Sequence, residues 1–342
     1  MPMSLMHSEL RETSIVCERI LSQNAARISE LAALLQKREP PLIITCARGS
    51  SDMAASYAKT LFESRLGTIV ASYAPSMSSI YDTNFRKLDN AVFIVISQSG
   101  KSPDIIASLI AANEAGALTI AIVNDENSPA AGLADFVLPL CAGPEKSVAA
   151  TKSFIASLFV ICDLVAAWQN DYELLTALEA APNAFAKAAE IDWSNAIDVL
   201  TPAKNMFVLG RSLTFGIAGE AALKLKETSG LHAEAFSAAE VKHGPMALVK
   251  DGFPVLMFPP LDAARSQFEP LVSEFATRGA KCIIVGENYE GAIKLPTING
   301  LHPLIDPMAK VLSFYNMAET LSRARGLDPD KPPFLQKVTR TQ

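Results

Sequence analysis

Short runs of consecutive apolar residues recur along the chain, and each is followed by a polar turn and a segment with helical periodicity. Runs of this length predict strands that are buried on both faces. Strands that alternate with helices indicate parallel sheets covered by helices on both sides, so the pattern predicts an α/β fold. The expected strands are 42–46, 92–96, 117–123, 205–210, 253–258 and 281–285.

The two halves of the chain resemble each other in the order of these elements. Glu63 pairs with Glu227, and Ala115-Gly116-Ala117 pairs approximately with Arg278-Gly279-Ala280, and both offsets are near 163 residues. The chain is therefore expected to hold two doubly wound subdomains. We expect a helical lead-in over 1–38, a first subdomain over 39–170, a helical connector over 171–202, a second subdomain over 203–327 and a C-terminal tail over 328–342.

The segment Ile96-Ser-Gln-Ser-Gly-Lys-Ser-Pro-Asp104 joins an apolar strand to a helical pattern that Pro103 opens. Free backbone N–H groups and the positive end of the helix dipole meet at such a junction, which suits a phosphate. Ser97, Ser99 and Ser102 add hydroxyl donors without adding charge. The alternative is an ordinary serine-rich loop between a strand and a helix.

A second junction of the same kind follows the first expected strand, where Cys46 is followed by Ala-Arg-Gly-Ser-Ser-Asp52. Ser50 or Ser51 can cap the helix that follows or can bind an anion. Loops on neighbouring parallel strands converge at the carboxyl ends of the sheet, where open α/β sheets bind ligands. The two junctions together therefore predict one anion site.

Composition narrows the choice of function. The chain has 342 residues, a net charge of −6 and 19% charged residues, which argues against a nucleic-acid partner. Its five cysteines lack metal-like spacing and fall mostly in apolar runs, as reduced core residues of a cytoplasmic protein do. The first residues lack the pattern of a signal peptide, so we expect a cytoplasmic protein.

The longest apolar stretch, 153–168, contains Asp163 and is too short to span a bilayer. We therefore expect a buried helix there and no association with a membrane.

Lysine, glutamate and histidine gather in the second half. Lys224 and Glu227 lie three residues apart and share a helix face, where they form either a reactive pair or a solvated surface ion pair. His243 precedes a Gly-Pro turn, where a histidine can reach a ligand or can interact with the end of a helix dipole. His232 and Glu234 form a His-X-Glu pattern, but no third well-spaced ligand accompanies it, so no metal is expected.

Three segments together resemble the sugar isomerase (SIS) family, and more narrowly the isomerase half of glucosamine-6-phosphate synthase. They are Ser97-Gln-Ser-Gly-Lys-Ser, Gly143-Pro-Glu-Lys-Ser-Val-Ala-Ala-Thr-Lys152 and Ala222-Leu-Lys-Leu-Lys-Glu with the following Glu240-Val-Lys-His-Gly-Pro245. The resemblance covers about residues 40 to 342. It implies two SIS subdomains, each a parallel five-stranded sheet in a flavodoxin-like three-layer αβα sandwich.

The resemblance also implies roles for individual residues. Glu227 would be the base that moves a proton between C1 and C2 of the sugar, with Lys224 beside it. His243 would open the sugar ring and would complete the site of a neighbouring subunit, which implies a homodimer. Lys337 would form an imine with a ketose. The residues expected to bind the sugar phosphate are Ser50, Ser51, Ser97, Gln98, Ser99, Ser102, Glu145 and Val148.

The synthase carries an N-terminal glutaminase domain that supplies ammonia, and only about forty residues precede the first SIS strand here. The expected reaction is therefore the reverse one, glucosamine 6-phosphate and water giving fructose 6-phosphate and ammonia. No nucleotide cofactor is expected, since there is neither a Gly-X-Gly-X-X-Gly nor a Walker motif. Three alternatives stay open: a fructosamine-6-phosphate deglycase, a galactosamine-6-phosphate deaminase or isomerase, and a non-catalytic sugar-phosphate sensor.

Overall fold

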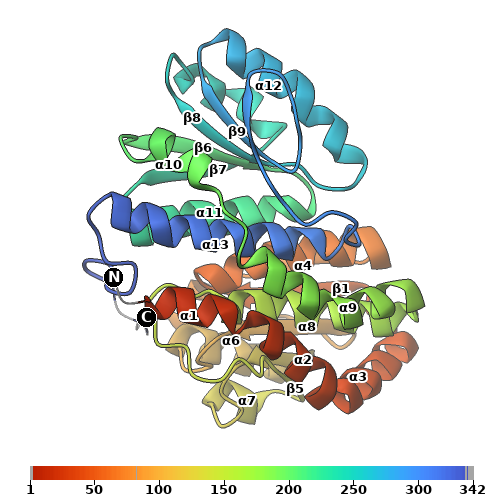
Figure 1. Cartoon of the computed structure of the whole chain (residues 1–342). Helices are drawn as coiled ribbons and strands as arrows, with labels where there is room; N and C mark the ends of the chain where they lie inside the picture. The colour runs from red at the N-terminus through yellow and green to blue at the C-terminus, as the bar shows by residue number, and fades with distance from the viewer. Residues whose placement is uncertain (1–2, 82, 336, 338–342) are drawn as a thin grey trace. The chain divides into compact units, whose positions relative to one another are not determined.

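In a computed structural model, which describes residues 3–81, 83–335 and 337, the chain forms two parallel five-stranded sheets flanked by helices (Figure 1). The α/β fold expected from the sequence is confirmed. Contacts divide the residues into two compact units. The first-sheet unit comprises the described parts of 15–145, 152–179 and 336–342, and the second-sheet unit comprises those of 1–14, 146–151 and 180–335. Neither unit is continuous in sequence.

The first sheet has the strand order β2-β1-β3-β4-β5, and all its strands are parallel. Its strands are β1 (Leu42–Ala47), β2 (Ile69–Ser72), β3 (Ala91–Ser97), β4 (Leu118–Val123) and β5 (Phe136–Pro139). Every residue of β3 and β4 is buried, which explains why the sequences of these strands are almost entirely apolar.

Helices cover both faces of this sheet. On one face, α6 (Pro103–Glu114) packs against β3, β4 and the short α7 (Pro129–Leu133), and Ile105 and Leu109 join the core beneath it. Successive side chains of a strand point to opposite faces of the sheet. The other face packs against α4 (Ser50–Leu66). Behind α4 lies α8 (Lys152–Gln169), which also packs against α3 (Ala25–Arg38). The unit also contains α5 (Ser76–Ser79). Of α2 (Thr13–Gln23) it contains the part from Ile15 onward, and of α9 (Tyr172–Ala188) the part up to Glu179.

The second sheet has the order β10-β9-β8-β6-β7. Its strands are β6 (Asn205–Gly210), β7 (His232–Ser237), β8 (Pro254–Phe258), β9 (Lys281–Val285) and β10 (Ala292–Leu295). One face packs against α12 (Phe268–Thr277) through an apolar core, and α11 (Leu213–Ser229) packs against β6, β7 and β8 and beside α13 (Asp306–Ala324) (Figure 1). The unit also holds α1 (Leu5–Arg11), α10 (Ser194–Leu200) and the 3-10 turns η1 (Glu240–His243), η2 (Pro245–Leu248) and η3 (Ala263–Gln267).

The internal repeat is visible in the topology, since the order β7-β6-β8-β9-β10 reproduces β2-β1-β3-β4-β5. Equivalent strands begin at 42 and 205, at 69 and 232, and at 118 and 281, each pair 163 residues apart. Even the turn after the first strand is repeated. Gly49 and Ser212 precede α4 and α11 with φ of 57° and 56° and ψ of −132° in both cases. The serine therefore holds a backbone conformation that usually favours glycine.

The six strands expected from apolar runs are present within one or two residues of the expected positions. The pattern missed β2, β5, β7 and β10, which are short or contain exposed positions. Three of these four strands, β2, β7 and β10, have one or more exposed residues. An edge strand has a partner on one side only, so it lacks the continuous apolar run of a central strand.

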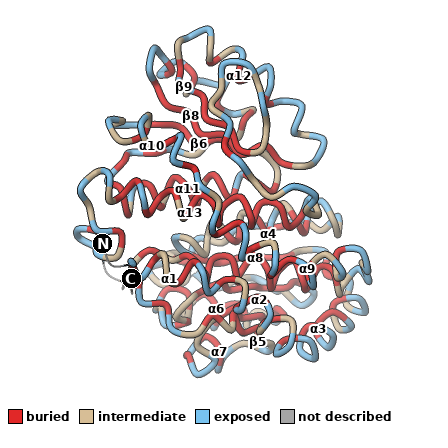
Figure 2. The backbone as a smooth tube through the Cα atoms, viewed as in Figure 1, coloured by how far each residue is buried: buried red, intermediate tan, exposed pale blue. Residues whose placement is uncertain are grey.

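The apolar stretch over 153–168 is the helix α8, which is buried along nearly its whole length (Figure 2). By length and composition α8 could cross a membrane, but 83% of its apolar window is buried inside the protein. Packing against α3 and α4 accounts for its composition. The expected buried helix is confirmed.

Asp163 is a carboxylate on this buried helix. Burial raises the pKa of its carboxyl from the ordinary value of 3.8 to about 6. The folded chain therefore holds this proton more tightly than the unfolded chain. The resulting stabilisation is fully present below about pH 4 and is lost as the pH rises through about 6.

Replacing Asp163 by asparagine is expected to raise the free energy of unfolding at pH 7.5 by about 1–3 kcal/mol, because an ionised buried carboxylate is removed. The gain should be much smaller at pH 4.5, where the folded-state aspartate is protonated. Urea unfolding of both proteins at the two pH values measures this, and Glu173→Gln on exposed α9 surface serves as the control. A gain that does not depend on pH would contradict the assignment.

Candidate active site

Two loops carry the residues expected to bind phosphate, and both follow neighbouring strands of the first sheet. Ala47 at the end of β1 lies beside Ile96 near the end of β3, so both loops leave the same edge of the sheet. The structure therefore brings Ser50 and Ser51 to the edge that also carries residues 97–102. This is the edge at which parallel α/β sheets bind ligands.

Ser50 and Ser51 form the first turn of α4 rather than its cap. The N-cap is Gly49, and no side chain donates or accepts a capping hydrogen bond there. The interpretation of these serines as helix caps is wrong for this helix. Both serines are half-buried and belong to the first turn of the helix, where helix ends attract anions.

The β3–α6 loop is held in shape by two of its own serines. Ser97 Oγ accepts a hydrogen bond of 3.1 Å from the N–H of Gly100, and Ser99 Oγ accepts one of 3.3 Å from the N–H of Lys101. Ser102 is the N-cap of α6, with Pro103 at the first helical position as expected, and its side chain makes no capping bond. Unlike the hydroxyls of Ser97 and Ser99, the hydroxyl of Ser102 accepts no hydrogen bond from the backbone of the loop.

Gly100 allows this loop to pass close to the start of α7. Its φ is +62°, and a Cβ atom there would lie 2.1 Å from Ser128 Oγ and 2.6 Å from Ser128 Cβ. The carbonyl of Gly100 also accepts a hydrogen bond from the N–H of Ala130. A side chain at position 100 would therefore push the loop away from α7.

Gly100→Ala is expected to weaken sugar-phosphate binding about tenfold or more, because the displaced loop no longer presents its N–H groups together. Titration calorimetry with fructose 6-phosphate measures the change. Gly132→Ala in α7 is a suitable control, since a Cβ atom there meets nothing within 4 Å. Equal affinity of the Gly100 variant and the control would show that the loop does not hold the phosphate.

Arg48 links the two loops and was not expected as a functional residue. Its guanidinium forms an ion pair of 2.9 Å with Asp104 in the first turn of α6, and the carboxylate is fully buried. The Arg48 side chain remains half exposed, so positive charge lies at the edge where the loops meet. Arg211, its equivalent 163 residues later, donates to Ser237 Oγ at 2.8 Å. The sequence signal that could have identified Arg48 is the presence of an arginine directly after the first strand of both repeats.

Glu145 and Lys337 are brought together by a direct ion pair of 2.8 Å. The buried Glu145 carboxylate also accepts hydrogen bonds from the N–H of Ser153 at 3.1 Å and from its hydroxyl at 2.7 Å. Neighbouring Lys152 donates to the carbonyl of Pro144 at 2.8 Å. Ser153 and Lys152 were not expected: Ser153 fixes the Glu145 carboxylate, and Lys152 fixes the backbone at Pro144, directly before it.

The half-buried Val148 lies in the segment 146–151, which belongs to the second-sheet unit. Glu9 of α1 fixes the start of this segment, because its buried carboxylate accepts hydrogen bonds from the N–H groups of Lys146 and Ser147. Sequence reasoning missed Glu9, since nothing local marks a carboxylate whose partners lie far along the chain.

Lys224 and Glu227 form an ion pair on α11. The lysine side chain is only 1% exposed and the glutamate 21%, so the interpretation as a solvated surface pair is wrong. Behind the lysine lies the fully buried Glu220, 3.6 Å from the ammonium, and Tyr315 donates to this carboxylate at 2.8 Å. One buried ammonium therefore stands between a buried carboxylate and an accessible one.

Glu227 and His243 are not brought together within the chain. Glu227 lies near the end of α11, close in sequence to His232 at the start of β7. The exposed His243 lies in η1, beyond the carboxyl end of β7. The two side chains thus belong to opposite ends of the same sheet, and β7 alone is about 20 Å long.

Among the residues that the structure describes, no group of three His, Cys, Asp or Glu side chains could hold a metal ion.

The SIS domain family model matches residues 38–167 and 199–324. A glutamine–fructose-6-phosphate aminotransferase (isomerizing) from Methanothermobacter thermautotrophicus is 36% identical over an alignment of 304 residues that covers 86% of this chain and 51% of that protein. The chain spans about half the length of the curated relatives it matches.

Among solved structures, a candidate phosphosugar isomerase from Silicibacter pomeroyi DSS-3 is 40% identical with a TM-score of 0.92, covering 96% of this chain and 100% of that one. The C-terminal domain of glucosamine-fructose-6-phosphate aminotransferase from Francisella tularensis is 26% identical with a TM-score of 0.81, covering 97% and 99%.

Proposed function

The chain belongs to the SIS domain family, and from that premise we propose that it is an amino-sugar phosphate deaminase. The proposed reaction converts glucosamine 6-phosphate and water into fructose 6-phosphate and ammonia. The observation that carries the proposal is the Glu227 carboxylate, which is partly accessible and held beside the buried Lys224 ammonium. An aldose–ketose interconversion needs a positioned base of this kind.

The proposed reaction begins when ring opening frees the C1 aldehyde. Glu227 then takes the proton from C2 and returns it to C1. The product of this transfer is an imine at C2. Water adds to that carbon, the C–N bond breaks, and ammonia leaves as the C2 ketone forms. Lys337 is proposed to act on the ketose side, where a lysine can form an imine with the carbonyl carbon.

The phosphate is proposed to bind at the two serine loops. The N–H groups at the starts of α4 and α6 and the hydroxyl of Ser102 supply donors, and Arg48 adds positive charge. These contacts lie far from the reacting carbons of the substrate, so their binding energy serves to position the sugar. We favour the hydrolytic direction because its only second substrate is water, whereas amination of the ketose phosphate requires a source of ammonia.

A homodimer is proposed because Glu227 and His243 lie at opposite ends of the second sheet. A histidine that opens the ring beside Glu227 must then come from another copy of the chain. Twofold symmetry would give each of the two sites one Glu227 and one His243 from different subunits.

Mixing two inactive variants tests this arrangement. If equal amounts of Glu227→Gln and His243→Ala subunits are refolded together, half of the dimers are mixed, and each contains one intact site. Activity should return to about a quarter of the wild-type value. Either variant refolded alone is the control. A mixture that stays inactive would place both residues in the site of a single chain.

The decisive experiment on the reaction is ammonia release from glucosamine 6-phosphate by the purified protein without glutamine, with fructose 6-phosphate assayed in parallel. Equal amounts of ammonia and ketose phosphate are expected. Binding of the sugar phosphate without ammonia release would reject the deaminase and favour a different sugar substrate or a sensor.

A further inference from the structure

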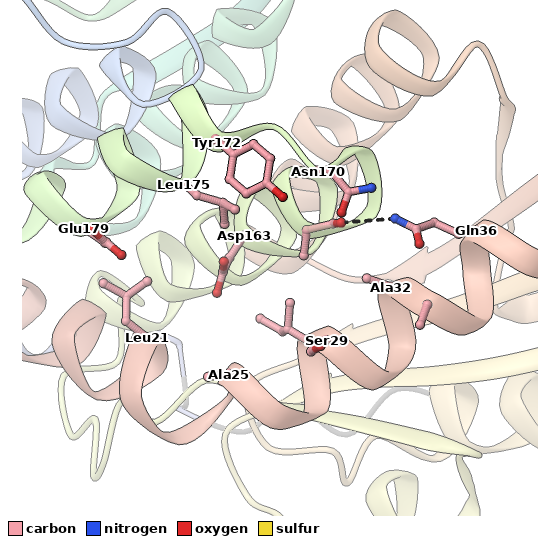
Figure 3. A pocket seen from close by; sticks show the side chains of 13 residues that line it. Leu21, Ala25, Ser29, Ala32, Gln36, Asp163, Asn170, Tyr172, Leu175 and Glu179 are labelled. Atoms are coloured by element: carbon pink, nitrogen blue, oxygen red, sulfur yellow. Dashed lines mark hydrogen bonds between the residues drawn. The ribbon is translucent and has the colours of Figure 1, made fainter.

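An open groove of about 440 Å³ lies between α3 and the segment that joins α8 to α9, within the first-sheet unit (Figure 3). Its volume is typical of a site for a small molecule. The α3 wall presents small and apolar side chains, among them Ala25, Ile28 and Ala32. Gln36 closes one end, where its amide donates to the carbonyls of Ala167 and Trp168 at 3.4 and 2.7 Å.

The floor of this groove carries the carboxylate of Asp163, which points from α8 toward α3 (Figure 3). The residue is 6% exposed. Within the part of the chain that the structure describes, its side chain makes neither a hydrogen bond nor an ion pair. A buried carboxylate without a counter-ion is costly, and a cation in the groove would remove most of that cost.

The rim adds to the negative character of the groove. Glu179 and Tyr172 on α9 line it, and the tyrosine side chain is 76% exposed. None of the thirteen lining residues is a lysine, arginine or histidine, so no positive side chain of the wall opposes the two carboxylates. An aromatic ring beside carboxylates is a common environment for an ammonium group.

We propose that this groove binds a small organic cation, a primary alkylammonium, whose charged end pairs with Asp163 and whose alkyl stem lies along the apolar wall of α3. The groove does not involve any residue of the proposed deaminase site. The inference is therefore independent of the proposed function, and either can fail without the other.

The test is titration calorimetry of the full chain with n-butylammonium chloride at pH 7.5, where Asp163 is largely ionised. Saturable binding is expected. Potassium chloride at equal ionic strength tests for a general salt effect, and n-butanol, of the same length without the charge, tests for binding by the stem alone. Neither is expected to bind saturably.

Two variants locate the site. Asp163→Asn should weaken n-butylammonium binding at least about tenfold, because a charge-assisted hydrogen bond is lost. This variant is expected to be at least as stable as the wild type, so weaker binding cannot be attributed to unfolding. Ser29→Phe, at an exposed position of α3 that lines the groove, should block binding while Asp163 remains.

Glu173→Gln, on exposed surface of α9 outside the groove, removes the same charge and should bind as the wild type does. Loss of affinity confined to the two groove variants would establish the site. Absence of saturable binding at millimolar n-butylammonium, or equal affinity of wild type and Asp163→Asn, would overturn the proposal.

Discussion

Replacing Glu227 by glutamine is expected to lower kcat for glucosamine 6-phosphate by about 10²–10⁴-fold, the usual contribution of a positioned general base. The amide keeps the size of the side chain but cannot accept the C2 proton. Binding of fructose 6-phosphate should change little, because its phosphate is proposed to be held by the serine loops. The variant should also stay folded, since Lys224 keeps the buried Glu220 at 3.6 Å.

Steady-state kinetics and calorimetry measure the two effects separately. Glu234→Gln on the exposed side of β7 is the control for the loss of a negative charge from the same unit. A kcat within a factor of a few of the wild-type value would show that another group takes the proton. A large loss of both kcat and affinity would point to a structural rather than a chemical role.

The second large effect concerns stability. Lys224→Met is expected to lower the free energy of unfolding by about 3–5 kcal/mol, the usual effect of removing one partner of a buried ion pair. The fully buried Glu220 carboxylate loses the Lys224 ammonium 3.6 Å away, although Tyr315 still donates to it. Urea unfolding at neutral pH measures the loss.

The double variant Lys224→Met/Glu220→Gln separates this electrostatic cause from a packing defect. Removing both charges should recover most of the lost stability, because a neutral amide costs much less to bury than a carboxylate whose ammonium partner has been removed. Activity should not return with it, since the lysine beside Glu227 is still absent. A double variant as unstable as the single one would attribute the effect to packing.

The expected effects at Glu227 and Lys224 both depend on one feature of α11, a single buried ammonium that lies between two carboxylates with different roles. Glu220 lies behind Lys224 and is tied to α13 through Tyr315, whereas Glu227 is the one that a ligand can reach. This arrangement lets the lysine fix the orientation of the proposed base. It also explains why the loss of stability and the loss of turnover can be separated by substitution.

Local sequence determined the central strands, the repeat and the two serine-rich loops. Apolar runs identified β1, β3 and β4 and their equivalents, because a strand buried on both faces consists mostly of apolar residues. Pro103 and the serines after β3 marked a strand–helix junction through local backbone rules alone. The same rules required no knowledge of distant residues, and the expected boundaries agree with the structure for that reason.

Other features depend on partners far apart in the chain, and only the tertiary structure decided them. Lys224 is buried beside Glu220, whose carboxylate accepts a hydrogen bond from Tyr315 on α13. The segment after Glu145 is fixed by Glu9 near the start of the chain. The sequence placed Asp163 on a buried helix, but its exposure to a groove depends on where α3 and α9 pack. Burial and charge pairing are properties of three-dimensional neighbours, which spacing along one helix or strand does not specify.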